Sequence, residues 1–328
     1  MKINKPTSLP LDKFIEWALY DKNSGYYMKK NPFGKDGDFI TAPNITRLFS
    51  EMISIWIITF WKSIGSPKKF NLLELGAGNG EMMKVIVESF KRFPSFVNGC
   101  NIIIHEKSPL LIKKQKNNIK FKNIKWIANL KEINKLPNIF LANEFFDAIP
   151  VKQFLKNENV WFEKFVHMSS SKKVSFINQK TDIKIIEKKV NFKISEKQNF
   201  IEYSPLGLRY LTDIFKFIRK NKGGLLIIDY GYFSEKMKDT LQAIYKQKYS
   251  NVLTNIGKSD ITYNINFFLI KKIVKNFKEL DVNYTTQKRF LSKLGIKHRA
   301  EIISKNKSFT QKADIFYRLK RLINKKEM

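Results

Sequence analysis

The sequence predicts an α/β fold with a doubly wound parallel sheet. From residue 70 onward, short runs of apolar, β-forming residues alternate with stretches of helical spacing, and each run ends at a polar residue or a glycine. Alternation of this kind is typical of a parallel sheet whose strands are joined by crossover helices. One run leads directly into a glycine-rich turn, a usual ligand-binding connection in such sheets. The four runs expected to form central strands are residues 72–75, 101–104, 139–142 and 225–228.

Helices are expected in front of this sheet. Ser8 and Pro10 supply a hydroxyl cap and an early proline for a first helix. The segment 31–43 contains two glycines and two prolines and no sustained period, so we predict a loop there. A second helix is predicted from Asn44, because apolar residues follow at helical spacing as far as Phe60.

The domain organisation follows from these elements. We place an N-terminal helical extension over residues 1–65 and the main domain over residues 66–328. A segment of about residues 155–200 has strand-like pieces and many lysines, which indicates an inserted antiparallel element. This insertion lies between the runs at 139–142 and 225–228, which we take as strands 4 and 5 of the sheet.

Composition excludes several classes of protein. The chain has 328 residues with one cysteine and three scattered histidines, which excludes a disulfide framework and a thiolate zinc site. We therefore expect no metal in the mechanism. The N-terminus lacks the pattern of a secretory signal or a transit peptide. The longest apolar run, Met52–Trp61, is shorter than the roughly 20 residues of a membrane-spanning helix. These features predict a cytoplasmic protein with no membrane span.

The charge is strongly positive, with 61 Lys and Arg against 29 Asp and Glu and a net charge of +32. Such a balance ordinarily favours nucleic-acid binding. However, only eight of the basic residues are arginine, and the lysines are spread along the whole chain. Base readout and forked phosphate contacts favour arginine. We interpret the charge as the residue usage of an AT-rich genome and expect no specific nucleic-acid role.

The most informative stretch is residues 71–80, NLLELGAGNG, where an apolar strand runs into a glycine-rich turn and then a helix. Glycines there allow the backbone to approach a nucleotide-like ligand at a helix N-terminus. A dinucleotide fingerprint would need glycine at position 81, which is Glu81. The E-L-G-x-G-x-G form instead resembles the first motif of class I S-adenosylmethionine-dependent methyltransferases, although a plain structural turn remains the alternative. The candidate cofactor residues are Glu74, Gly76, Gly78 and Gly80.

Two more segments are expected at the same sheet edge. Glu106 comes just after the second run, where an acid can accept both hydroxyls of a ribose. Its alternative is a surface glutamate at a strand end. The segment 126–130 brings a third loop to this edge, with Asn129 and the adjoining Leu130 as candidates for holding adenine.

The third run continues into Asn143-Glu144-Phe145-Phe146-Asp147-Ala148-Ile149-Pro150, where a methyl acceptor must approach. The carboxylates of Glu144 and Asp147 can grip a guanidinium and keep one nitrogen aimed at the methyl group. In-line transfer depends on this alignment and on a carboxylate that takes the proton. The alternative is that Glu144 caps a following helix and Asp147 is a solvated acid in its first turn. Asp229 and Tyr230, after the fourth run, line the acceptor pocket or simply end their strand.

Read together, the segments resemble the MidA-like family of methyltransferases. The resemblance covers most of the chain, and its most specific motifs are Gly37-Asp38-Phe39-Ile40-Thr41-Ala42-Pro43 and the Asn143–Pro150 run. Further matching segments are residues 18–20, 25–27, 74–80, 106–109, 161–163, 229–231 and 286–299.

The resemblance implies a Rossmann-like class I methyltransferase core, S-adenosylmethionine as the cofactor and a protein arginine as acceptor. In the mitochondrial relatives it implies symmetric dimethylation that supports assembly of respiratory complex I, so a complex I subunit is the expected partner. It also implies that the loop around Asp38, Thr41 and Pro43 folds over the cofactor. We also place Asn143, directly after the third run, among the cofactor-binding residues.

Three departures from the family concern the acceptor more than the cofactor. Asn264 and Asn266 stand where members tend to carry His and Asp, and Lys288 replaces a usual glycine. The chain also stops at Met328, where members usually continue into a short strand. Two alternatives to arginine methylation stay open. The basic charge motivates methylation of RNA or of a small molecule, and Asn264 and Asn266 suggest a non-catalytic assembly chaperone.

Overall fold

The structure is a computed structural model that describes residues 6–29, 32, 41–171 and 173–324. The chain forms two compact units. One contains Met1–Lys30, Phe145–Lys216 and Asp229–Lys278, and the other contains Asn31–Glu144, Phe217–Ile228 and Glu279–Met328. This division does not follow the predicted boundary at residue 65. The N-terminal extension over residues 1–65, with a loop around Asp38, Thr41 and Pro43 that folds over the cofactor, stays a prediction.

A five-stranded parallel sheet forms the centre of the second unit. Its order is β10-β5-β2-β3-β4, and every neighbouring pair is parallel. The predicted α/β class with a doubly wound sheet is confirmed. All four predicted runs are strands, and β4 is a fifth that the sequence indicated only as a loop. The strands are β2 (Phe70–Leu75), β3 (Cys100–His105), β4 (Ile124–Ile127), β5 (Asn138–Asn143) and β10 (Gly223–Ile228).

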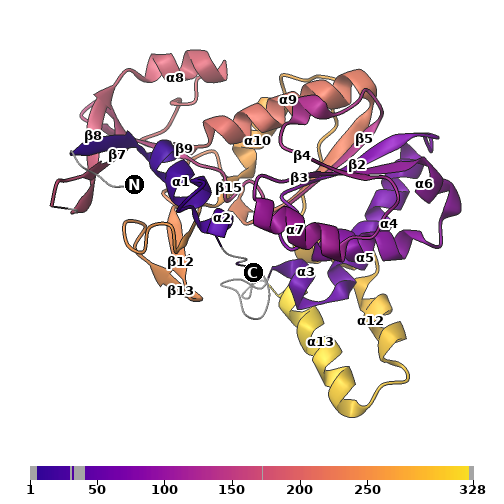
Figure 1. The fold of residues 1–328 in the computed structure, drawn as a ribbon. Helices are drawn as coiled ribbons and strands as arrows, with labels where there is room; N and C mark the ends of the chain where they lie inside the picture. Colours follow the sequence, from indigo (N-terminus) through magenta and orange to yellow (C-terminus); the bar gives the residue numbers. More distant parts are fainter. Residues whose placement is uncertain (1–5, 30–31, 33–40, 172, 325–328) are drawn as a thin grey trace. The chain divides into compact units, whose positions relative to one another are not determined.

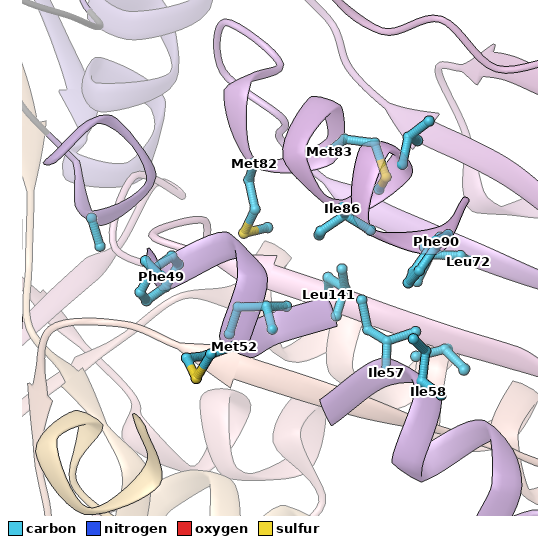
Figure 2. Packing of buried hydrophobic residues seen from close by; sticks show 14 of the residues in the cluster. Phe49, Met52, Ile57, Ile58, Leu72, Met82, Met83, Ile86, Phe90 and Leu141 are labelled. Atoms are coloured by element: carbon cyan, nitrogen blue, oxygen red, sulfur yellow. The ribbon is translucent and has the colours of Figure 1, made fainter. Parts of the chain in front are cut away.

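The core of this unit lies between the sheet and its helices. Figure 2 shows residues of α4 (Arg47–Ser63) and α5 (Glu81–Phe90) packed with Leu72 of β2 and Leu141 of β5. The same cluster takes in residues of the three C-terminal helices, α11 (Gln287–Lys293), α12 (Ile296–Ser304) and α13 (Phe309–Ile323). Other helices of the unit are α6 (Pro94–Gly99), α7 (Pro109–Asn118) and the short η1 (Leu130–Glu132).

The second predicted helix is two helices. The short α3 (Ala42–Ile45) precedes α4, and Thr46 between them has an extended backbone with φ −162° and ψ 147°. Its hydroxyl accepts a hydrogen bond from the backbone N–H of Leu48 at 3.3 Å, so it caps α4.

The first unit is built on an antiparallel sheet. Its strands run in the order β1-β7-β6-β9, and β8 pairs with β7. Residues 152–203 form most of it, which confirms the predicted antiparallel insertion between strands 4 and 5 of the parallel sheet. The elements are β1 (Thr7–Pro10), β6 (Lys152–Asn157), β7 (Val160–Met168), β8 (Val174–Thr181), α8 (Ile183–Val190) and β9 (Phe200–Tyr203).

The remaining elements of the first unit lie in residues 11–29 and 231–274. They are α1 (Leu11–Tyr20), α2 (Tyr26–Lys29), β11 (Gly231–Tyr232), β12 (Gln242–Tyr245), β13 (Lys248–Ser250), β14 (Asp260–Thr262), β15 (Ile265–Asn266) and α10 (Phe267–Val274) (Figure 1). The helix α9 (Pro205–Asn221) has its residues up to Lys216 in the first unit and those from Phe217 in the second. None of the described helices is both long and apolar enough to cross a membrane.

The start of α1 differs from the prediction. Ser8 is not its cap, because residues 7–10 pair with β7 and the Ser8 hydroxyl bonds to Nδ1 of His167 at 3.0 Å. Pro10 occupies the cap position with φ −51°. Since proline has a fixed φ near the helical value and no N–H, it ends the strand and starts the helix.

Candidate active site

The glycine-rich turn joins the end of β2 to α5. Gly76, Gly78 and Gly80 have φ values of 65°, 54° and 82°, in the left-handed region that other residues adopt only at a cost. A Cβ atom on Gly80 would lie 3.1 Å from Cδ1 of Ile119 and 3.3 Å from Cα of Gln115. Glycine is therefore required here by the backbone and by the closeness of the next helix.

Two buried carboxyl groups lie beside this turn. Glu74, on β2, is 3% exposed, and its Oε2 atom has no hydrogen-bond partner among the described residues. Burial, and secondly the charge of Glu106, raise the pKa of Glu74 from its usual 4.5 to about 8. Burial also raises the pKa of Glu106. The site therefore holds an acid whose ionised form lacks compensation within the protein.

Glu106 follows β3 and is held by its surroundings. Its Oε1 accepts hydrogen bonds from the backbone N–H groups of Lys107 and Ser108 at 2.8 and 2.9 Å, and its Oε2 accepts one from Nε2 of Gln115 at 3.1 Å. A carboxylate has about four acceptor positions. One position on Oε2 is thus left for a hydroxyl donor.

Gln115 is a site residue that sequence reasoning missed. It is fully buried, and Nε2 also donates to the carbonyl of Gly78 at 2.8 Å, while Oε1 accepts from the indole N–H of Trp126 at 2.9 Å. One amide thereby joins the turn after β2, the acid after β3 and strand β4. The only sequence signal was a glutamine one turn after Leu111 on the inward face of α7.

The predicted adenine loop follows β4. The backbone N–H of Glu106 donates to the carbonyl of Ile127 at 3.2 Å, so this loop adjoins the acid. Asn129 caps η1: its Oδ1 accepts from the N–H of Lys131 at 3.0 Å, and its own N–H donates to Glu132 at 2.9 Å. The side-chain oxygen of Asn129 is thus engaged. A role of Asn129 or Leu130 toward adenine stays a prediction.

The end of β5 carries Asn143 and Glu144. The Oδ1 atom of Asn143 is buried and has no hydrogen-bond partner within the described part of the chain. Glu144 has a left-handed backbone with φ 48°. Strained conformations of this kind in a bulky residue cluster at functional sites. The Glu144 carboxylate accepts from the N–H of Ala42 at 3.4 Å, which brings the segment of Thr41 and Pro43 to the same edge.

Asp147 belongs to the other unit from Glu144. It is 8% exposed, and residues 144–150 form no helix. The alternative in which Glu144 caps a helix and Asp147 is a solvated first-turn acid is therefore wrong. The backbone N–H groups of Phe146 and Asp147 both donate to Oδ2 of Asp229, at 3.0 and 3.3 Å. Asp229 thus fixes the backbone of this loop, and Tyr230 next to it is 38% exposed.

Tyrosines and acids surround Asp147 within its unit. Burial raises the pKa of Tyr263 well above its usual value, and the negative charges of Asp229, Glu202 and Asp147 raise it further. The backbone N–H of Tyr263 donates to the carbonyl of Asp147 at 3.2 Å.

Asn264 and Asn266, which depart from the family, make local hydrogen bonds that involve the backbone. Asn266 caps α10, because its Oδ1 accepts from the N–H groups of Phe268 and Leu269 at 3.0 and 3.4 Å. The N–H of Asn264 donates to the Thr240 hydroxyl at 2.9 Å. Asp38 lies outside the described residues. The described residues contain no group of three or more His, Cys, Asp or Glu side chains suited to a metal ion.

Comparison with known proteins identifies the family of this chain. The profile of the family described as "Putative S-adenosyl-L-methionine-dependent methyltransferase" matches residues 52–286. The chain belongs to this family. The prediction of an S-adenosylmethionine-dependent methyltransferase of the MidA-like group is confirmed, as is the cofactor.

Curated relatives share about a quarter of their residues with this methyltransferase. "Protein arginine methyltransferase NDUFAF7, mitochondrial" of Xenopus tropicalis is 26% identical over 94% of this chain and 76% of its own length. The human protein of the same name is 26% identical over 92% and 73%. The Drosophila melanogaster homologue is 27% identical over 84% and 68%.

Two solved structures share the fold. A Burkholderia thailandensis protein bound to S-adenosyl-homocysteine has a TM-score of 0.82 and 20% identity, covering 98% of this chain and 85% of its own. A native structure from the same organism has a TM-score of 0.79 and 19% identity, covering 98% and 84%. These likenesses show the class I methyltransferase fold.

One prediction is corrected by these findings. We expected a cytoplasmic protein, but the relatives are named as mitochondrial proteins, which contradicts that expectation. The expectation rested on the absence of a targeting pattern in the first residues. An absence of that kind does not identify a compartment.

Proposed function

We propose that this methyltransferase methylates arginine in a protein, and that its acceptor is a subunit of respiratory complex I. The observation that carries the proposal is the acidic loop after β5, where Glu144 has a strained backbone and Asp147 is buried. The relatives named protein arginine methyltransferase support it, as does the resemblance to the MidA-like family. Symmetric dimethylation is part of the proposal.

The residues at the edge of the parallel sheet fit the cofactor. Bound S-adenosylmethionine supplies an electrophilic methyl group on a sulfonium. The unpartnered Oε2 of Glu74 is suited to a cationic donor, because an opposite charge would favour its ionised form. Glu106 has an acceptor position for a ribose hydroxyl, and the backbone of Gly76, Gly78 and Gly80 permits close approach.

Asn143, Thr41 and Pro43 complete the proposed cofactor residues. The buried Oδ1 of Asn143 is available to a donor. Thr41 stands at the N-cap position of α3, and its hydroxyl accepts from Nδ2 of Asn44 at 2.8 Å, so Thr41 is held against the start of this helix. We propose that the segment of Thr41 and Pro43 covers the cofactor.

Glu144 and Asp147 are the proposed catalytic residues. Each carboxylate can accept charged hydrogen bonds from a guanidinium, which fixes the direction of the reacting nitrogen. A carboxylate in this position also accepts the proton that the nitrogen loses as the new bond forms. Holding the acceptor in line supplies most of the expected acceleration.

The test is methyl transfer from labelled cofactor in a cell lysate, followed by mass spectrometry of the labelled product. We expect label on arginine of a complex I subunit. Glu144→Gln and Asp147→Asn should abolish transfer while cofactor affinity, measured by calorimetry, stays near that of the natural protein. Glu301→Gln, at an exposed site on α12, is the matched control. Label on RNA or a small molecule would reject the arginine proposal, and absence of cofactor binding would favour a chaperone.

A further inference from the structure

The C-terminal helices carry a local excess of positive charge. Residues 287–324 contain 11 Lys and Arg against two acidic residues. This is an excess of about one positive charge in four residues, compared with about one in ten for the whole chain at +32 in 328. Lysine is about as frequent here as elsewhere, at seven in 38 residues against 53 in 328, so the excess comes from the four arginines and the scarcity of acidic residues.

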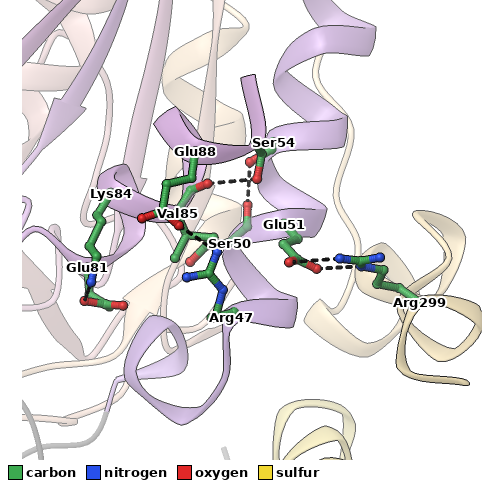
Figure 3. A network of polar contacts seen from close by, with 10 residues as sticks. Arg47, Ser50, Glu51, Ser54, Glu81, Lys84, Val85, Glu88 and Arg299 are labelled. Atoms are coloured by element: carbon green, nitrogen blue, oxygen red, sulfur yellow. Dashed lines mark hydrogen bonds and ion pairs between the residues drawn. The ribbon is translucent and has the colours of Figure 1, made fainter. Parts of the chain in front are cut away.

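The inward face of these helices is firmly attached to their own unit. Figure 3 shows Arg299 of α12 against Glu51 of α4, with nitrogen–oxygen distances of 2.8 and 3.2 Å. Arg318 of α13 donates to the carbonyl of Ile45 at 2.9 Å. Leu319 and Leu322 of α13 are buried in the core cluster. The helices are therefore a fixed part of the structure, and only their other face needs an explanation.

The outward face of α13 carries large apolar side chains. Phe309 is 88% exposed, Tyr317 62% and Phe316 43%. Phe309, Phe316 and Lys320 are spaced by seven and four residues, so they share one side of the helix, and Lys312 lies one turn from Phe309 and Phe316. We call Phe309, Lys312, Phe316, Tyr317 and Lys320 the aromatic stripe.

We propose that the aromatic stripe docks this methyltransferase on an anionic membrane surface. A helix with exposed aromatic residues among lysines lies in the interface of a bilayer, where rings enter the headgroup region and cations attract anionic lipids. Tyrosine and other aromatic side chains favour that depth. The stripe supplies both components along one helix.

Charge and shape favour lipid over nucleic acid. Two of the four arginines in residues 287–324, Arg299 and Arg318, hold the carboxylates of Glu51 and Asp314. The cations of the stripe itself are lysines, which lack the forked geometry that grips phosphates and bases. An exposed helix face also suits a flat, fluid surface.

The experiment measures co-sedimentation of the full chain with vesicles of phosphatidylcholine containing phosphatidylglycerol. We expect the protein to bind the vesicles that contain phosphatidylglycerol and to bind pure phosphatidylcholine vesicles only weakly. Lys312→Ala/Lys320→Ala should lower the partition coefficient about 25-fold, at about fivefold per charge. Phe309→Ala/Phe316→Ala should lower it by about tenfold or more.

The matched control is the exposed β12–β13 turn, which also places lysines beside an aromatic ring. Tyr249 there is 80% exposed and lies next to Lys248, with Lys246 nearby. Tyr249→Ala and Lys246→Ala/Lys248→Ala should leave vesicle binding unchanged. All variants should keep the cofactor affinity of the natural protein, which shows that they are folded.

Three outcomes would overturn the proposal. Equal losses in the stripe and control variants would show diffuse charge attraction. Self-association that the stripe variants abolish, without vesicle binding, would make the stripe an interface between copies. Loss of RNA binding in the stripe variants, with no vesicle binding, would assign the surface to nucleic acid.

A second measurement places the stripe at the membrane directly. A fluorophore attached to Phe309→Cys, with Cys100 buried, should shift its emission only on anionic vesicles.

Discussion

Replacing Glu74 by glutamine should stabilise the cofactor-free protein and weaken its binding of the cofactor. In the folded protein the Glu74 carboxyl has a pKa of about 8, against an ordinary value of 4.5. Burial is the main cause, and the Glu106 charge is the second. Between pH 4.5 and 8, folding therefore makes the Glu74 carboxyl take up a proton. Above pH 8 it buries an uncompensated charge.

The magnitude follows from the difference in pKa. Well below pH 4.5, Glu74 is protonated in both states and costs nothing. As pH rises, the unfolded protein gains stability relative to the folded one by about 1.4 kcal/mol per pH unit. The effect levels off above pH 8. Its full size is about 5 kcal/mol, and relaxation around the site reduces it, so we expect Glu74→Gln to gain about 3–5 kcal/mol at pH 8.5.

The assay is denaturant unfolding of the natural protein and Glu74→Gln from pH 5 to 8.5, paired with calorimetry of cofactor binding. The stability difference should grow with pH, while the variant binds the cofactor more weakly. Glu301→Gln should change neither quantity. A variant that is less stable at pH 8.5, or that keeps full cofactor affinity, would refute the view that Glu74 is an uncompensated acid awaiting a cation.

Three further predictions concern the same site. Gly80→Ala, at a φ of 82°, should lose about 1–2 kcal/mol of stability and cofactor affinity, as measured by thermal unfolding and calorimetry. Gln115→Leu removes the donor to Gly78 and Glu106 and should cost about 2–4 kcal/mol, with a fall in cofactor affinity. Asp229→Asn weakens the acceptor for Phe146 and Asp147 and should lower single-turnover methyl transfer, while cofactor affinity is unchanged, since its carboxylate holds the backbone of the loop proposed to bind the acceptor.

The strands and the glycine turn could be predicted because their signals are local. β2 and its turn are visible in ten consecutive residues, with each glycine at a position that needs a left-handed backbone. β4 was missed as a strand because it has only four residues and lies at the edge of the sheet, half exposed. The start of α1 was misassigned, since nothing local shows that residues 7–10 pair with β7, some 160 residues away.

The site residues divide in the same way. Glu106 and Asn143 were singled out because each comes just after an apolar run, and Glu74 because it precedes the glycine-rich turn; their roles stay predictions. Gln115 could not be found, because its importance comes from three partners that the fold assembles from separate loops. The helix-cap alternative for Glu144 was plausible in sequence and fails because no helix follows.

The charge of the chain shows why composition alone misleads in both directions. A net +32 suggested nucleic acid, and the even spread of lysines then suggested no function. Neither interpretation could separate lysines on solvated faces from those beside exposed aromatic rings, because exposure depends on which face of each helix enters the core. For α13 the core takes Leu319 and Leu322, while Phe309, Phe316 and Lys320, which share another side of the helix, stay exposed. The exposed side of α13 is therefore not purely polar, because it combines positive charge with apolar area. That combination selects an anionic, partly apolar partner.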